Sequence, residues 1–385
     1  MKVYSKQAQT NNQNMTAQPS VYILGFGAIG SLLGVHLQKY GGTKVTPLFR
    51  SLGRLSDFKT NDYEVSIKPL YDSSLEILTE RFPDASCPEN FKGKIDNLIV
   101  TCKTYQTADA LRPFLPYLDN NSNIIMIQNG LGVAEVLKEQ VFNGGDLKPN
   151  LFQGVIAHGI FQDSEIKNQY NHAGFVDCKI SKLPENDSDI IETFADLEAL
   201  KQNELIKMLN SLDQSLGVVH MTYQELLLGQ LEKFLVNCCI NSVTSIIDCM
   251  NGELANCAGP IFQSIIEEAI NVFHTAYKPL FDYEDIYKGA KHGQLPKLNV
   301  AGRLNVATML ENTMHVGCVV NGGNSSSMRQ DVLNLRETEI DYINGYVVTL
   351  CKKFSLPESN AKVNRTIQEL VKLRLKLNQT RKAGQ

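Results

Sequence analysis

The chain has 385 residues, of which 43% are hydrophobic and 20% charged, and its formal net charge at pH 7 is −4. This length is sufficient for two domains. Because the sequence has no long basic run and no stretch of about 18 apolar residues, we expect it neither to bind nucleic acid nor to span a membrane.

The N-terminal segment 1–19 is polar and rich in Gln and Asn, and we predict a disordered tail. It lacks the apolar core of a signal peptide. It also lacks both acidic residues and arginine, which leaves a mitochondrial presequence as the lesser alternative to a cytoplasmic protein. The nine cysteines show neither a CxxC pair nor metal-ligand spacing, so we expect a reducing compartment and no metal site.

Strand-like and helix-like segments alternate in the first half of the chain. The expected strands are 21–24, 44–50, 96–103 and 123–128, and the expected helices between them are 28–40 and 107–118. Such alternation predicts a parallel, doubly wound sheet of the Rossmann type over residues 20–220. Two more β-like runs, 151–161 and 172–182, could extend the sheet as hairpin strands, and 217–221 forms a last short run.

From about residue 222 onward the apolar residues follow a helical spacing. The expected helices are 222–248, 259–277, 300–316, 328–353 and 358–376. We therefore predict an all-helical C-terminal domain over 221–385, which would bind the substrate. The stretch 183–205 before it is rich in Asp, Glu and Asn and is interpreted as a surface insertion.

A glycine-rich motif, GxGxxG, lies directly after the first strand and opens the first helix. Its residues are Gly25, Phe26, Gly27, Ala28, Ile29 and Gly30. Glycines at these positions permit a tight turn, and the helix N-terminus offers free N–H groups to a pyrophosphate. In this context the motif predicts a dinucleotide site.

The end of the second strand indicates which dinucleotide binds. No Asp or Glu occurs from Thr43 to Ser56, where NAD-binding proteins place an acidic residue, and Arg50 stands there instead. Arg50 can bind a 2′-phosphate, so NADPH is the expected cofactor. Arg54 could assist or could be an ordinary surface charge. Lys103 and Asn129 follow the next two parallel strands and are expected to border the nicotinamide.

Three polar residues, Lys233, Asn237 and Asn241, share one face of the otherwise apolar helix 222–248. A lysine buried in such surroundings is costly and can have a shifted pKa. The ridge could be satisfied by a neighbouring helix, or it could hold a polar ligand. Carbonyl reduction needs a proton as well as a hydride, and Lys233 is a candidate donor.

Two further candidates lie in segment 324–346. Glu339 falls in the middle of an apolar stripe formed by Val332, Leu335, Tyr342 and Tyr346, where a carboxylate is usually paired or functional. Ser327 and Gln330 have the spacing of a capping box, so Ser327 is expected to cap a helix and could also contact a substrate carboxylate.

Taken together, these motifs resemble the ketopantoate reductase family. The matching pieces are GFGAIG, CKT, QNG, KFLVNCCIN, NGEL and SSMRQDVLNLRETEIDYINGY, which run in family order from residue 21 to about 346. The resemblance implies NADPH-dependent reduction of 2-dehydropantoate to pantoate in a cleft between a Rossmann domain and a helical domain.

The resemblance also implies a role for each matched residue. Lys233 matches the catalytic lysine, the expected proton donor. Glu339 matches a catalytic carboxylate that holds a substrate hydroxyl and also contacts the cofactor. Asn129, Asn237, Asn241 and Ser327 match substrate contacts. The glycine loop, Arg50, Lys103 and Asn129 match cofactor contacts.

Some features depart from the family pattern. Segments 52–95 and 183–205 look longer than in compact bacterial members, and Ser242 stands where proline is common. The partner expected is a small 2-keto acid, with the protein a monomer or homodimer. Alternatives are a reductase of another branched 2-keto acid and a non-catalytic NADPH-binding regulator.

Overall fold

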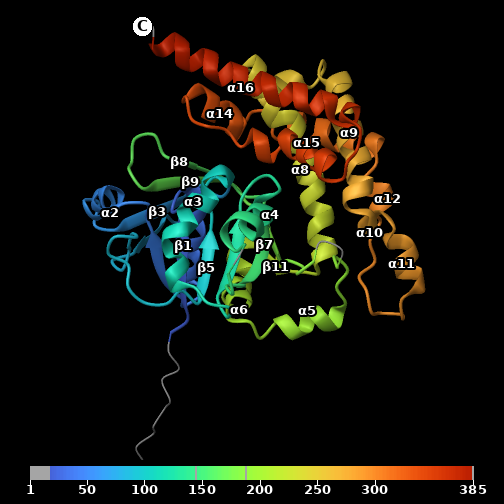
Figure 1. Ribbon diagram of the computed structural model, residues 1–385. Coiled ribbons are helices and arrows are strands. Elements are labelled where there is room, and N and C mark those ends of the chain that lie inside the picture. The colour runs from blue at the N-terminus through green and yellow to red at the C-terminus, as the bar shows by residue number, and fades with distance from the viewer. Residues whose placement is uncertain (1–17, 144, 187–188, 384–385) are drawn as a thin grey trace, which may run out of the picture.

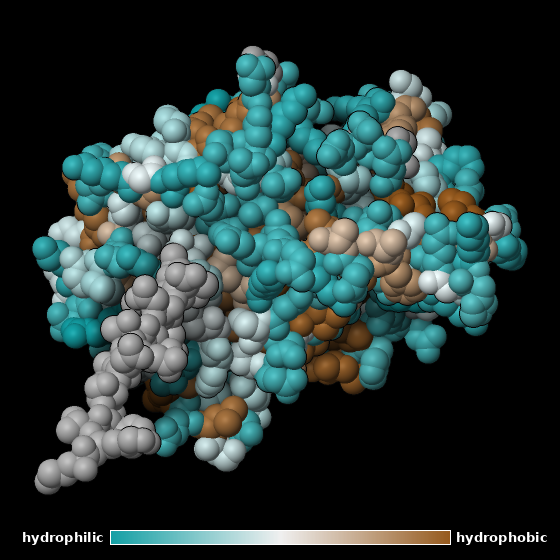
Figure 2. Space-filling view, turned by 90° about the horizontal axis from the view of Figure 1, so that it is seen from below, coloured by the Kyte–Doolittle hydropathy of each residue, from teal (hydrophilic) through white to brown (hydrophobic). Residues whose placement is uncertain are grey.

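The computed structural model describes residues 18–143, 145–186 and 189–383, so residues 1–17 of the predicted tail lie outside the described part. Figure 1 shows an α/β body with a layer of helices above it. Seen from below, the surface is mostly hydrophilic with scattered apolar patches (Figure 2). In the part of the chain that is described, no helix combines the length and apolarity needed to cross a membrane.

A seven-stranded sheet forms the centre of the N-terminal half, in the order β11-β10-β7-β6-β5-β1-β2. The five neighbouring strands β2, β1, β5, β6 and β7 run parallel to one another. Strand β10 is antiparallel to β7, and β11 is parallel to β10. This arrangement confirms the predicted α/β class. The strands are β1 Ser20–Leu24, β2 Lys44–Leu48, β5 Asn97–Val100, β6 Asn123–Ile127, β7 Asn150–Ile156, β10 Cys178–Lys182 and β11 Val218–His220.

Both faces of this sheet are covered. Because successive side chains of a strand point to opposite faces, Ile99 packs in one core cluster with α1 (Ala28–Lys39) and α6 (Glu204–Asn210). Val100 packs in another with α3 (Thr107–Leu111) and α8 (Tyr223–Ile247). The helices of this half are α1 Ala28–Lys39, α2 Leu52–Lys59, α3 Thr107–Leu111, α4 Val133–Val136, α5 Phe194–Leu200, α6 Glu204–Asn210 and α7 Asp213–Leu216. The expected helix 107–118 continues beyond α3 only as a 3-10 turn, Arg112–Tyr117, which contains two prolines.

A second sheet of four strands, in the order β4-β3-β9-β8, packs against α1 on the side away from the main sheet. Its strands are β3 Glu64–Pro69, β4 Leu78–Arg81, β8 Gly159–Gln162 and β9 Gln169–Gly174. The two runs 151–161 and 172–182 pair antiparallel as expected and extend the main sheet through β7 and β10, but the ends where they face each other, β8 and β9, pair in the second sheet. Segment 52–95 supplies α2 and half of the second sheet.

The C-terminal half is all-helical, as predicted. Its helices are α8 Tyr223–Ile247, α9 Gly259–Ala276, α10 Lys278–Phe281, α11 Tyr283–Gly289, α12 Val300–Arg303, α13 Val306–Asn312, α14 Ser327–Leu333, α15 Asn344–Lys353 and α16 Lys362–Ala383. Helix α8 packs on the main sheet, which joins the two halves into one core.

Two of the expected helices are interrupted. The segment 300–316 breaks between α12 and α13, where the side chain of Asn305 caps a new helix by accepting from the N–H of Thr308. The segment 328–353 breaks after α14, where Leu335 adopts a left-handed φ of 57°. The chain then makes a 3-10 turn at Ile340–Tyr342 before α15 begins.

Candidate active site

The glycine loop between β1 and α1 has the shape that a dinucleotide requires. A Cβ at Gly25, whose φ is +96°, would lie 2.3 Å from the backbone N of Cys102, so only glycine fits. A Cβ at Gly30 would lie 2.5 Å from the carbonyl oxygen of Gly25. Among the described residues, by contrast, a Cβ at Gly27 would meet nothing within 4 Å, and no side chain caps the N-terminus of α1. The loop thus leaves free N–H groups beside open space, which fits a pyrophosphate.

The loop is held from one side and packed on the other. The hydroxyl of Thr101 donates to the carbonyl oxygen of Gly25 at 2.7 Å. The ring of Phe26 contacts three other aromatic rings, while Ala28 and Ile29 pack against the core beneath α1. The three non-glycine residues of the motif therefore contribute packing that fixes the position of α1.

Arg50 is exposed directly after β2, and Ser51 caps α2 by accepting from the N–H of Arg54. The structure also brings an acidic residue there that sequence reasoning missed. Segment 86–90 lies against the end of β2, with the N–H of Phe49 donating to the carbonyl of Ser86 at 2.8 Å. The pKa of Glu89 in this segment is lowered, chiefly by its own backbone N–H and then by the side chain of Cys87 and the backbone N–H of Leu52.

A small pocket lies where the main sheet meets α8. It brings together Asn129, which follows β6, with Lys233 and Asn237, which are one turn apart on α8. The lining residues are Gln128, Asn129, Gly130, Val155, Gln230, Lys233, Phe234 and Asn237. Asn241 is buried one turn further along α8 and is not among them. The two outer members of the predicted ridge thus differ: Lys233 faces the pocket, and Asn241 lies beyond it.

The amine of Lys233 donates to the carbonyl oxygen of Ile156, the last residue of β7, at 2.5 Å. Burial lowers the pKa of this lysine, and the opposing effects of Cys178, Glu339 and Asp177 are smaller. A lysine with a lowered pKa loses its proton more readily than an ordinary one. Its surroundings therefore suit proton donation to a carbonyl oxygen in the pocket.

A second polar cluster bridges the two halves next to this pocket. The carboxylate of Glu339 accepts from the N–H of Thr104 at 3.2 Å and from its hydroxyl at 3.0 Å. The amine of Lys103 lies 2.8 Å from a carboxylate oxygen of Asp331 and 3.3 Å from one of Glu339. Burial favours a lower pKa for Lys103, but these two carboxylates outweigh it and raise the pKa.

Glu339 is buried, as expected, but it does not lie on an apolar stripe of a helix. The residue lies at the start of the 3-10 turn after the break, and no continuous helix carries an apolar stripe from Val332 to Tyr346. The turn is fixed instead by the loop after β6, because the N–H of Leu131 donates to the carbonyl of Tyr342 at 2.9 Å. That contact ties the segment of Glu339 to the segment of Asn129.

Ser327 opens α14 and is exposed, but it does not cap the helix as expected. The cap is Ser326, whose hydroxyl accepts from the N–H of Arg329 at 3.1 Å and lies 2.7 Å from the hydroxyl of Thr244 on α8. The predicted capping box is therefore wrong by one residue. Because its hydroxyl is not used for capping, Ser327 is available to a ligand at the N-terminus of α14.

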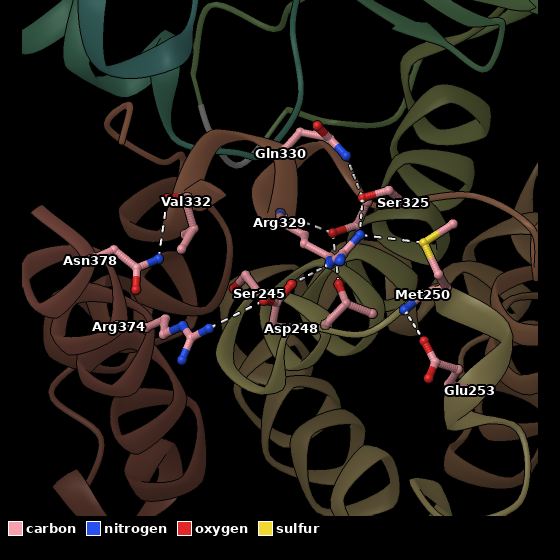
Figure 3. Close-up of polar contacts among 12 residues, drawn as sticks. Ser245, Asp248, Met250, Glu253, Ser325, Arg329, Gln330, Val332, Arg374 and Asn378 are labelled. Carbon is pink, nitrogen blue, oxygen red and sulfur yellow. Dashed lines mark hydrogen bonds and ion pairs between the residues drawn. The ribbon is translucent and has the colours of Figure 1, made fainter. Parts of the chain in front are cut away.

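A network of polar contacts holds α14 against the end of α8 (Figure 3). The guanidinium of Arg329 donates to Asp248 at 2.8 Å and to the hydroxyl of Ser325 at 2.9 Å. Asp248 also pairs with Arg374 of α16 at 3.4 Å. These contacts set where the first turn of α14, and hence Ser327, lies relative to α8.

Sequence reasoning missed three polar residues of this region. Asp331 lies four residues after Ser327 and so on the same helix face, a spacing that could have signalled it. Thr104 follows Lys103 directly in a CKT motif. Gln230 precedes Lys233 by three residues on α8 and lines the same pocket. Among the described residues, no group of three or more His, Cys, Asp or Glu side chains could hold a metal ion.

Comparison with known proteins links most of the chain to one family. Residues 21–185 match the family model described as ketopantoate reductase PanE/ApbA, and residues 225–375 match its C-terminal model. A 2-dehydropantoate 2-reductase of Saccharomyces cerevisiae is 46% identical over 95% of this chain and 98% of its own length. A probable 2-dehydropantoate 2-reductase of Schizosaccharomyces pombe is 40% identical, covering 94% and 98%.

Solved structures share the fold at lower identity. A D-mandelate dehydrogenase structure with NADH and anilino(oxo)acetate superposes with a TM-score of 0.66 at 17% identity, covering 94% of this chain and 99% of the other. A putative 2-dehydropantoate 2-reductase from Enterococcus faecalis gives 0.62 at 19% identity, covering 93% and 99%.

Proposed function

Since this chain belongs to the ketopantoate reductase family, we propose that it reduces 2-dehydropantoate to (R)-pantoate, a step of pantothenate and coenzyme A synthesis, with NADPH as the reductant. The observation that carries this proposal is the pocket in which Lys233, of lowered pKa, meets Asn129 and Asn237. A regulator that only sensed the cofactor would need the glycine loop but not this pocket.

The proposed cofactor site combines the glycine loop with the end of β2. The loop from Gly25 to Gly30 would hold the pyrophosphate, and Arg50 would hold the 2′-phosphate by charge-assisted hydrogen bonds. Lys103 and Asn129 would border the ring, at the carboxyl ends of β5 and β6. When bound, the reduced nicotinamide supplies the hydride for the carbonyl carbon.

The residues of the helical half supply the rest of the chemistry. Lys233 is the proposed proton donor to the carbonyl oxygen, and its burial strengthens the electrostatic interaction with a developing alkoxide. Asn129, Asn237 and Asn241 are proposed to orient the 2-keto acid, and Ser327 to contact it from α14. Glu339 is proposed to bind substrate and cofactor hydroxyls, which requires it to exchange Thr104 and Lys103 for the ligand.

We propose the two domains as 20–220 and 221–385. The end of β11 at His220 and the start of α8 at Tyr223 support this boundary. For the assembly we keep the monomer and the homodimer open. A structural neighbour from Staphylococcus aureus is described as a dimeric ketopantoate reductase, which supports testing the homodimer first.

The proposal is tested by following NADPH oxidation by the purified protein. The panel contains 2-dehydropantoate, 3-methyl-2-oxobutanoate, which lacks its hydroxymethyl group, and an aromatic 2-keto acid. We expect the highest kcat/KM with 2-dehydropantoate. A higher value for another 2-keto acid would establish the alternative reductase, and no turnover of any member together with tight NADPH binding would indicate a regulator.

A further inference from the structure

Gln128, the last residue before Asn129, has a buried polar atom without a partner. Its Nε2 donates to the carbonyl oxygen of Cys102 and, at 2.7 Å, to the hydroxyl oxygen of Thr107. Its Oε1 is buried and has no hydrogen-bond partner among the residues that the structure describes. Most buried side-chain acceptors in proteins are paired, so this atom needs an explanation.

The orientation of this amide is fixed by its neighbours. Exchanging the two ends would place Oε1 against the carbonyl oxygen of Cys102, which is also an acceptor. The hydroxyl of Thr107 donates to the carbonyl of Lys103 at 3.3 Å, so it accepts the hydrogen bond from Gln128. Oε1 is therefore the free end of the amide, and a bound molecule can supply its donor.

The position of Gln128 suggests which molecule this is. The residue lines the same pocket as Asn129, Lys233 and Asn237, at the end of β6. Lys233 and the amide groups offer donors, which match the keto and carboxylate oxygens of a 2-keto acid. Gln128 offers an acceptor, and the carboxamide of a nicotinamide ring carries an –NH2 group with two donors.

We propose that Gln128 is a cofactor-binding residue whose Oε1 accepts a hydrogen bond from the carboxamide –NH2 of the nicotinamide. This inference rests on the proposed function. The hydrogen bond would fix the rotation of the ring about its glycosidic bond and so select which face lies toward Lys233. Gln128 is thereby a determinant of cofactor recognition at the nicotinamide end, as Arg50 is proposed to be at the adenosine end.

The test compares NADPH with its reduced 3-acetylpyridine analogue, in which a methyl group replaces the –NH2 group. Dissociation constants are measured by titration calorimetry without substrate. We expect the wild-type protein to bind NADPH about tenfold more tightly than the analogue, the factor for one hydrogen bond. In Gln128→Leu the two constants should agree to within about twofold.

A matched control is available on the neighbouring strand. Gln153 of β7 is also buried, and its Nε2 donates to the carbonyls of Met126 and Gly154 at 3.0 and 3.1 Å. It does not line the pocket of Lys233. Gln153→Leu should therefore keep the tenfold preference for NADPH, which separates the acceptor of Gln128 from the general effect of losing a buried glutamine.

Three results would overturn the proposal. One is equal binding of the two cofactors by the wild-type protein, a result that needs no variant to fold. Another is an unchanged tenfold preference in folded Gln128→Leu, or in Gln128→Met if the leucine variant does not fold. The third is a variant that loses only its preference for 2-dehydropantoate over 3-methyl-2-oxobutanoate, since Oε1 would then serve the substrate hydroxyl. Failure of the wild-type protein to bind either nucleotide would instead refute the cofactor itself.

Discussion

Replacing Lys233 by methionine removes the proposed proton donor while keeping the length of the side chain. The change leaves the carbonyl of Ile156 without its donor, which costs about 1–3 kcal/mol. It also removes an ammonium group that is buried, whose desolvation costs several kcal/mol or so. These opposing contributions leave the free energy of unfolding little changed. The barrier to reduction, in contrast, should rise by about 3–5 kcal/mol, a loss of roughly 10²–10⁴ in kcat.

The assay is the pH dependence of kcat, followed as NADPH oxidation with saturating 2-dehydropantoate. In the wild-type protein kcat should fall at high pH as Lys233 loses its proton, at a pH below the ordinary lysine value because burial lowers the pKa. In Lys233→Met this decline should disappear. Lys103→Met is the matched control, because Lys103 lies at the same site but pairs with Asp331 and Glu339, which raise its pKa.

Two results would refute this reasoning. A folded Lys233→Met protein with kcat within a few-fold of wild type would remove the role of proton donor. A decline at high pH that persists in Lys233→Met but vanishes in Lys103→Met would assign the titration to the other lysine. NADPH affinity should stay nearly unchanged in Lys233→Met, and its loss would point to a cofactor contact instead.

Three further predictions concern the α/β half. Arg50→Ala should weaken NADPH binding by roughly 10–100-fold and NADH binding far less, measured by calorimetry; equal losses would contradict the 2′-phosphate contact. Gly25→Ala should lower the melting temperature by several degrees or more, because its Cβ would meet backbone atoms. Gly27→Ala should keep the fold and weaken cofactor binding. Equal melting temperatures of the two variants would exclude the steric argument. Burial lowers the pKa of His172 to about 4 and that of His36 to about 3, so as pH falls the unfolded chain takes up these protons before the folded protein does. The free energy of unfolding should therefore fall as pH drops from about 6.5 toward 4, by up to about 1.4 kcal/mol per pH unit for each histidine. A flat free energy of unfolding in urea titrations between pH 7 and 5 would contradict this prediction.

The features that sequence predicted well are those that depend on neighbours along the chain. The glycine loop needs only a strand, a turn and a helix in succession, and the side chains of Lys233 and Asn237 share a face because the helix repeats every 3.6 residues or so. The element order and the change to helices near residue 222 follow in the same way from local apolar spacing.

The features that sequence missed depend on residues far apart in the chain. The second sheet pairs β3 with β9 across about a hundred residues, and no local pattern distinguishes such a strand from one that extends the main sheet. The helix is interrupted at Leu335, which adopts a left-handed backbone conformation although it is not glycine. Without a glycine as a signal, the sequence predicted a continuous helix with an apolar stripe through this position. Ser326 and Ser327 are both serines before a helix, and only contact with Thr244 decides which one caps it.

If Glu339 binds the ligand as proposed, its contacts couple ligand binding to separation of the two halves. Its carboxylate joins the two halves through Thr104 and Lys103, which lie 235 and 236 residues away along the chain. A ligand that takes this carboxylate must first release those contacts, so its apparent affinity is its intrinsic affinity reduced by the fraction of molecules that are open. Substitutions such as Thr104→Val would then tighten ligand binding without touching the ligand, by lowering the free energy required to open the cleft.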